Sequence, residues 1–197
     1  MSIAFKLPDL MTVEEFLRWK GGDPGIIYEL VDGVVRAQDP ASDTHNMIFG
    51  NLHGDIRNHL RAHRPHCRVV PTAGIQPRLR AAWNWRVPEF AVTCTPNRRD
   101  VHATEGAILV VEVLWPTNGN DTWGNVPLYA SLPTVTEILL VESTKVAGHL
   151  LRREADGSWP KDPTPLAAGA IVELQSIGLE LPLAEAYAGT WLVGEDR

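Results

Sequence analysis

The stretch Ile108-Leu109-Val110-Val111-Glu112-Val113-Leu114-Trp115 decides the fold. It is short, rich in β-branched residues and closed by Pro116, which is typical of a strand buried on both faces. Burying an unpaired carboxylate is so costly that such groups usually become protonated, form an ion pair or bind a metal. Glu112 is therefore either a hydrogen-bonded or ion-paired core residue, or part of a functional site.

Local signals before this strand predict a short helix and a hairpin. Residues 12–15, Thr-Val-Glu-Glu, form a capping box, and Gly21-Gly22 is expected to end the helix that it begins. Asp32-Gly33 lies between two apolar runs at 26–31 and 34–37. An Asp-Gly pair in that setting is a strong hairpin signal.

A second helix is predicted to begin at Ser42 or Asp43 and to run to about His63, because its apolar residues recur at near four-residue intervals. Further elements follow along the chain. They are strands at 87–93 and 107–114, a helix at 120–132 weakened by Gly124 and Pro127, a strand at 137–141, a peripheral hairpin within 146–159, closing strands at 169–174 and 176–181, and a helical turn at 183–187.

Length and composition indicate one domain. At 197 residues, with 44% apolar and 21% charged residues, the chain can bury a core of its own. The pattern of elements predicts an α+β fold around a central mixed sheet flanked by helices, with peripheral β-hairpins, over residues 1–197. No apolar run is long enough to cross a bilayer and the first residues lack a secretory signal, so we expect a cytoplasmic protein.

The two cysteines, Cys67 and Cys94, are too few for a disulfide framework or a cysteine-based zinc site. They are most simply interpreted as small buried hydrophobes. Histidines at 59, 63 and 66 have a spacing that a metal site can use, but arginines between them and the absence of a neighbouring acid disfavour zinc.

Charge is spread unevenly along the chain. The net charge is −6, yet residues 56–104 contain nine Arg and only two acids. Such a segment suits a phosphate-facing surface on an otherwise acidic protein. A solvated helix face explains Arg57, Arg61 and Arg64 equally well.

Three acids fall on or beside strands predicted to be central: Glu29, Glu89 and Glu112. Antiparallel pairing of the strands at 87–93 and 107–114 would bring Glu89 and Glu112 to one end of the sheet. Carboxylate oxygens from several strands are the ligands that Mg²⁺ prefers. Such a cation can activate a water molecule and stabilise charge that develops on a phosphate.

These segments occur in an order that resembles the Uma-two family of proposed restriction endonucleases. The resemblance covers about residues 10–187 and rests on order and spacing, since no single motif is specific. The segments are Tyr28-Glu29-Leu30-Val31-Asp32-Gly33, His45, Pro88-Glu89, Val110-Val111-Glu112-Val113-Leu114, Asp121, Tyr129 and 137–142. It implies the restriction-endonuclease-like fold of the PD-(D/E)xK nuclease superfamily.

The resemblance also implies roles. Glu29, Glu89 and Glu112 would bind Mg²⁺ or Mn²⁺, and His45 would border that site. The partner would be DNA, and the chain would form a homodimer. The position of the superfamily's helical lysine, which supplies positive charge to the site, is Asn125 here. An uncharged side chain there predicts a rate loss of ~10²-fold or more.

Two more departures from the family pattern concern the same region. Glu89 stands where the family has Asp, and Trp115 stands where it has Ser. Tyr28 and Tyr129 are expected to pack in or near the core. The tryptophans near the expected site either stack on bases or, more simply, pack in the core or at a dimer interface; they are Trp83, Trp85, Trp115 and Trp123.

Three functions remain open from the sequence. The first is a metal-dependent DNA endonuclease of restriction type, impaired by the loss of the lysine. The second is a non-catalytic relative that acts as a nucleic-acid-binding or dimeric interaction module. The third is a metal hydrolase for a small phosphorylated substrate, which the acidic bulk of the chain favours.

Overall fold

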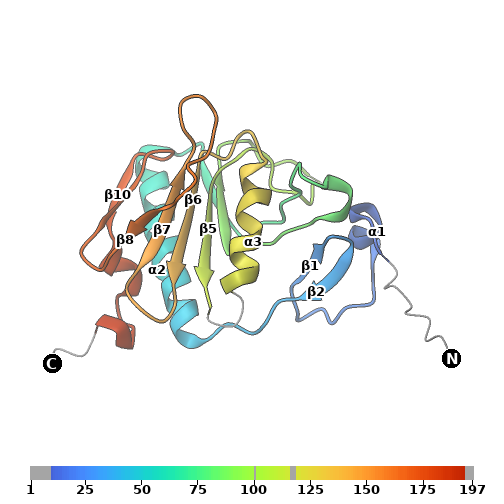
Figure 1. The fold of residues 1–197 in the computed structure, drawn as a ribbon, viewed down its shortest axis with the longest axis horizontal. Coiled ribbons are helices and arrows are strands. Elements are labelled where there is room, and N and C mark those ends of the chain that lie inside the picture. The colour runs from blue at the N-terminus through green and yellow to red at the C-terminus, as the bar shows by residue number, and fades with distance from the viewer. Residues whose placement is uncertain (1–9, 100, 116–118, 194–197) are drawn as a thin grey trace.

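The computed structural model of the chain describes residues 10–99, 101–115 and 119–193, apart from the side chains of 119–121. Its centre is a sheet with the strand order β3-β4-β5-β6-β7-β8 (Figure 1). All neighbouring pairs are antiparallel except β5 and β6, which are parallel, so the predicted mixed sheet is confirmed. The strands are β3 (Arg68–Pro71), β4 (Phe90–Thr93), β5 (Ala107–Leu114), β6 (Glu137–Glu142), β7 (Gly148–Arg152) and β8 (Thr164–Leu166).

The decisive strand, β5, is buried on both faces as predicted. Its alternate residues Leu109, Val111 and Val113 belong to one core cluster, together with the apolar stripe of helix α2 (Asp43–His63). Val110 and Leu114 belong to a second cluster, which includes apolar residues of helix α3 (Gly119–Ala130). Because side chains alternate along a strand, Glu112 falls on the α3 side of the sheet.

Helix α2 begins and ends where the sequence predicts. The Ser42 side chain caps it by accepting a hydrogen bond from the backbone N–H of His45 at 3.2 Å. Ile48, Leu52 and Ile56 are fully buried against the sheet. Despite its length, neither this helix nor another in the described part of the chain is apolar enough for a membrane span.

The N-terminal part contains the predicted helix and hairpin, at the right of Figure 1. Helix α1 (Val13–Arg18) begins with the complete capping box of Thr12 and Glu15. Strands β1 (Tyr28–Val31) and β2 (Val34–Ala37) form a separate two-stranded sheet, joined by Asp32 and Gly33 in left-handed conformations. Leu30 pairs with Trp85, which fastens this hairpin to the segment that leads into β4.

The C-terminal part forms a second two-stranded sheet, of β9 (Ile171–Leu174) and β10 (Leu179–Pro182). The short helices are η1 (Ala81–Trp83), η2 (Leu183–Tyr187) and η3 (Trp191–Val193). Two predictions were wrong here. The hairpin expected within 146–159 is not peripheral, because β7 pairs with β6 and continues the central sheet to β8. Strand β3 was not predicted, because its four residues carry too little pattern to distinguish a strand from a loop.

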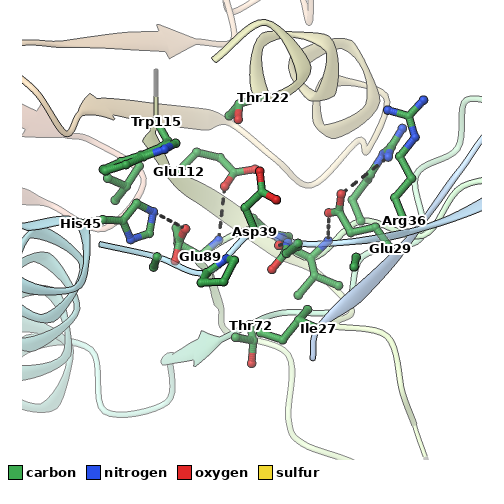
Figure 2. Close-up of a pocket in the computed structure, with 18 of the residues that line it drawn as sticks. Ile27, Glu29, Arg36, Asp39, His45, Thr72, Glu89, Glu112, Trp115 and Thr122 are labelled. Atoms are coloured by element: carbon green, nitrogen blue, oxygen red, sulfur yellow. Dashed lines mark hydrogen bonds and ion pairs between the residues drawn. The ribbon is translucent and has the colours of Figure 1, made fainter. Parts of the chain in front are cut away.

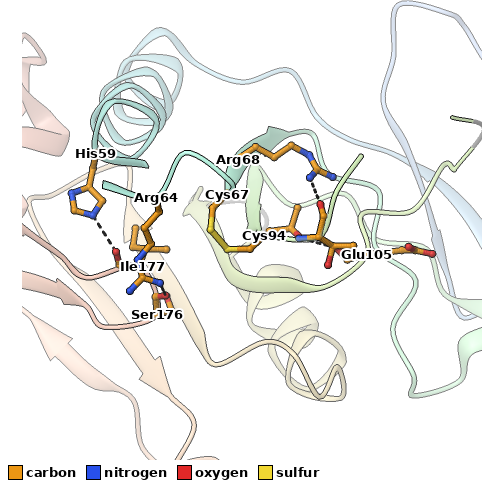
Figure 3. The surroundings of a disulfide bond; sticks show 10 residues. His59, Arg64, Cys67, Arg68, Cys94, Glu105, Ser176 and Ile177 are labelled. Carbon is orange, nitrogen blue, oxygen red and sulfur yellow. Dashed lines mark hydrogen bonds between the residues drawn. A yellow bond between two sulfur atoms is a disulfide. The ribbon is translucent and has the colours of Figure 1, made fainter. Parts of the chain in front are cut away.

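The prediction for the cysteines was also wrong: Cys67 and Cys94 form a disulfide (Figure 3). The register of β3 and β4 pairs Arg68 with Thr93, so the adjacent cysteines lie opposite each other with Cα atoms 3.9 Å apart. Pairing over a separation of 27 residues depends on this register. Without β3 in the predicted fold, the sequence could not reveal it.

Candidate functional site

A cavity of about 690 Å³ lies between the β1–β2 hairpin, the beginning of α2, the segment 86–89, the end of β5 and helix α3 (Figure 2). All of the predicted site residues line it: Glu29, His45, Glu89, Glu112 and Asn125. They come from elements far apart in the sequence. The fold therefore gathers the predicted residues around one cavity.

Glu112 is the most deeply buried acid of this cavity, with 7% of its surface exposed. Its Oε1 accepts a hydrogen bond of 2.7 Å from the Tyr129 hydroxyl, and its Oε2 accepts one of 3.4 Å from the backbone N–H of Glu89. The pairing of Phe90 with Val111 places Glu89 across from Glu112 on antiparallel strands. The arrangement predicted for these two acids is thus present.

Glu89 is oriented by a histidine. His45, in the first turn of α2, places its Nε2 2.9 Å from Glu89 Oε1, and Figure 2 shows this contact beside Glu112. The other ring nitrogen, Nδ1, is buried and has no hydrogen-bond partner in the described part of the chain. The predicted place of His45 beside the acids is therefore observed.

Glu29 is held differently from the other two acids. Its Oε1 accepts a hydrogen bond of 2.6 Å from the backbone N–H of Val87, and its Oε2 lies 3.8 Å from a terminal nitrogen of Arg86. Figure 2 shows Glu29 on the arginine side of the cavity, away from Glu89. The cavity thus has an acidic half at Glu89 and Glu112, and a mixed half at Glu29 and Arg86.

Burial and mutual repulsion set the electrostatics of the acids. Burial, together with the negative charges of Glu89 and Glu29, raises the pKa of Glu112 to about 8, while the hydrogen bond from Tyr129 opposes the shift. Burial also raises the pKa of Glu29, against the lowering effects of the Val87 N–H and the Arg86 charge. The positive charges near the site therefore do not offset the cost of ionising these two buried carboxylates.

The donor chemistry of the acidic half fits a hard divalent cation. Carboxylate oxygens are the ligands such a cation takes, and its positive charge would offset the burial and the repulsion that together raise the pKa of Glu112. The three glutamates do not meet at one point. Among the described residues, one group of three or more His, Cys, Asp or Glu side chains has all its ligand atoms within 4.8 Å of one another. It consists of His66, Cys67 and Cys94, and none of the three glutamates belongs to it. Glu89 and Glu112 are the better placed pair, because the register of β4 and β5 sets them across from each other, and Glu29 lies to one side.

Helix α3 presents the position of the missing lysine. Asn125 is half-buried and lines the cavity, as do Thr122 and Gly124 from the same helix. The helix continues through Pro127, although a proline at this position was predicted to weaken it. The side chain of Asp121, part of the family resemblance, lies outside the described residues.

Sequence reasoning missed one contact of Tyr129 and two residues of the cavity. Arg86 and Asp39 line it, and Tyr129 is a core residue as expected but also donates to Glu112. The family pattern did contain Tyr129, but the pattern does not say where its hydroxyl points. For Arg86 the only signal was its place shortly before Glu89, since one Arg among the nine of its segment does not stand out.

The remaining predicted candidates lie elsewhere or have structural partners. The Nε2 of His59 lies 3.0 Å from the Ile177 carbonyl oxygen, and its ring packs against His63. Of the tryptophans, Trp115 lines the cavity and Trp85 is buried in the core.

Comparison with known proteins shows the family. The model of the Uma2 family, described as "Putative restriction endonuclease", matches residues 13–184. An uncharacterized protein of Synechocystis sp., slr1290, is 31% identical over 181 residues, which are 91% of this chain and 92% of that protein. The crystal structure of a putative nuclease belonging to DUF820 from Anabaena variabilis has the same fold, with a TM-score of 0.70 at 14% identity over 90% of this chain and 97% of that one. This chain belongs to the Uma2 family.

Proposed function

We propose that this protein is a metal-dependent DNA endonuclease that hydrolyses phosphodiester bonds. Family and fold support a nuclease role. The observation that carries the finer proposal is the juxtaposition of Glu89 and Glu112 in one cavity, with Glu112 buried beside another acid and without a cationic partner in any described contact. A core that only needed to fold would gain from replacing such a residue by an apolar one.

Glu89 and Glu112 are the proposed ligands of Mg²⁺ or Mn²⁺. When bound, the cation supplies a water of lowered pKa and stabilises negative charge that develops on the phosphate. The role of Glu29 as a third ligand stays a prediction. Its carboxylate is occupied by the Val87 N–H and faces Arg86, which favours a supporting role.

His45 and Tyr129 orient the two ligands. The His45 contact fixes one oxygen of Glu89, and the Tyr129 hydroxyl fixes one oxygen of Glu112. The second oxygen of Glu112 accepts the long contact of 3.4 Å from the Glu89 N–H, and the lone pairs that remain on both carboxylates can bind a cation. Holding ligands in one orientation is the usual task of groups behind a metal site. Their loss is expected to lower cation affinity by about 10-fold to 100-fold.

A non-catalytic relative is the second candidate, and Asn125 is the observation that favours it. An amide in the place of the family's lysine orients water but carries no charge. Such a protein would bind nucleic acid, or act as a dimeric interaction module, without cleaving. Its homodimeric state is a prediction that light scattering coupled to gel filtration would measure.

The experiment is cleavage of supercoiled plasmid and of labelled duplex oligonucleotides with Mg²⁺ or Mn²⁺. The native chain is compared with Glu112→Gln and Glu89→Gln, which keep size and remove charge. Glu180→Gln, at an exposed position of β10 outside the cavity, is the matched control. Thermal melting confirms that each variant is folded.

The endonuclease proposal expects native cleavage that depends on the cation. Each cavity variant should lose about 10²-fold or more of the rate, and the control should retain it. Cleavage that persists in both Glu112→Gln and Glu89→Gln would overturn the proposal. Duplex binding by a native chain that never cleaves would favour the second candidate.

A further inference from the structure

The cavity contains positive charge despite lacking the family's lysine. The arginines among its described lining residues are Arg36 and Arg86. Arg36 is exposed, so water and salt screen its charge. Arg86 is 5% exposed, and a buried charge acts on its neighbours through a medium of lower dielectric constant.

The guanidinium of Arg86 is held but not neutralised. One terminal nitrogen donates to Asn84 Oδ1 at 3.1 Å, and the other lies 3.8 Å from Glu29 Oε2, beyond hydrogen-bonding distance. The third nitrogen, Nε, is buried and has no hydrogen-bond partner within the described residues. Burying an arginine with one unbonded donor and one long ion pair lowers the stability of the fold. A ligand that bonds to the guanidinium would explain why such a residue is present.

A rigid support fixes this guanidinium in place. The backbone N–H and C=O of Arg86 both bond to Ile75. Asn84 is fully buried, and its side chain bonds to both the backbone and the carboxylate of Asp32 in the hairpin turn. A donor that is already oriented loses little freedom when it binds an anion.

We propose that Arg86 binds a phosphate of the substrate and supplies the positive charge that Asn125 cannot. Glu29 then acts as a positioning residue, because its loose ion pair holds the guanidinium until a phosphate oxygen replaces it. The fork of N–H donors on an arginine matches phosphate geometry. This inference rests on the proposed function, since it assumes a phosphodiester at the Glu89–Glu112 site.

The first test is binding of a 12-base-pair DNA duplex, followed by fluorescence anisotropy at several salt concentrations with Ca²⁺ as the cation. Arg86→Gln should weaken binding about tenfold or more and reduce the slope of log affinity against log salt by about 1, as loss of one phosphate contact does. Arg18→Gln removes an exposed charge on α1, outside the cavity, and is the control. Arg86→Lys keeps the charge without the fork and should lie between the native chain and Arg86→Gln.

The second test asks whether the charge can be moved. Asn125→Lys in the Arg86→Gln background should restore at least part of the lost affinity and salt slope, because both positions line one cavity. In the native background the same substitution should gain less than about tenfold in cleavage, since a buried cation is already present. A native-background gain of 10²-fold or more would overturn the role of Arg86.

Calorimetry with Mn²⁺, in the absence of DNA, separates the two proposals and guards against misfolding. Arg86→Gln should bind Mn²⁺ at least as tightly as the native chain, because a positive charge beside the acids has been removed, whereas a collapsed site would lose the cation. Unchanged duplex affinity and salt slope in Arg86→Gln would overturn this inference alone. Mn²⁺ binding that survives in both Glu89→Gln and Glu112→Gln would overturn the metal site, and a native chain that fails to bind the duplex would overturn both proposals.

Discussion

Two buried glutamates on adjacent parallel strands show how one residue type serves different ends. Glu137 begins β6 and is 1% exposed, and its carboxylate accepts hydrogen bonds from Arg152 at 2.8 Å, from the Gln175 N–H at 3.1 Å and from the Ser176 N–H at 2.8 Å. Glu112, near the end of β5, receives one phenol hydrogen bond and one long amide contact. Its charged neighbours are the acids Glu89 and Glu29.

The difference separates a structural acid from a functional one. Glu137 has a cation and two backbone donors, and it ties the central sheet to the β9–β10 sheet. Glu137 is thus a core glutamate whose charge and hydrogen bonds are fully partnered. The sequence left this open as one of two interpretations of Glu112. Glu112 has no such set of donors, so folding alone does not account for it.

The largest expected difference is in how stability depends on pH. The pKa of Glu112 is about 8 in the folded protein and near the ordinary 4.5 when unfolded. Between these values the unfolded chain releases a proton that the folded chain retains, so stability falls as pH rises from about 5 to about 8. For protein treated with a chelator, we expect the free energy of unfolding to fall by on the order of 3–5 kcal/mol over this pH range.

Urea unfolding at pH 5, 7 and 9 would measure this loss. Glu112→Gln should remove that part of the pH dependence and be more stable than the native chain at pH 9. If the stability of the native chain and of Glu112→Gln changed in parallel across this pH range, the proposed difference between Glu112 and Glu137 would be contradicted.

The next effect concerns the structural acid. Glu137→Gln removes the charge opposite Arg152 and weakens the hydrogen bonds that the side chain accepts from two backbone N–H groups. We therefore expect a loss of about 3 kcal/mol in the free energy of unfolding at every pH tested. Thermal or urea unfolding measures it. A stability gain like that of Glu112→Gln at pH 9 would show that the two acids do not differ as proposed.

The smallest effect is that of the single phenol hydrogen bond. Tyr129→Phe keeps the ring in the core and removes the hydroxyl that donates to Glu112 Oε1. We expect a cost of about 1 kcal/mol at pH 5. A Tyr28→Phe variant, whose hydroxyl accepts from the exposed Asp23 N–H, is the control and should change stability less. Equal effects of the two substitutions would contradict a special role for the Glu112 hydrogen bond.

Much of the fold could be predicted from the sequence because many of its elements are specified by interactions between residues that are close together in the chain. The capping box at Thr12, the Asp32-Gly33 turn and the apolar stripe of α2 each act within one or two turns of chain. Strand β8 contains Pro165, and β3 is only four residues long. Neither strand could be predicted without knowing the neighbouring strand with which it pairs. The Cys67–Cys94 disulfide depends on one of those missed pairings.

The same limit applies to the site. The pairing of Glu89 with Glu112 was predictable because two neighbouring apolar runs set one antiparallel register. The distinction between Glu112 and Glu137 was not, since both stand in similar apolar runs. It depends on Arg152 and the turn before β10, which meet Glu137 only in the folded chain. Arg86 likewise acquires its role through Glu29, which lies on a separate segment and meets it only in the folded chain.

The most direct test of the central claim is calorimetric titration of Mn²⁺ into the native chain, Glu112→Gln and Glu137→Gln, at a temperature where all three are folded. We predict that Glu112→Gln weakens binding about tenfold or more, because a carboxylate ligand is lost, whereas Glu137→Gln stays within about twofold of the native affinity. Equal Mn²⁺ affinity in the native chain and Glu112→Gln, or no binding by the native chain, would contradict the claim that Glu112 belongs to a metal site.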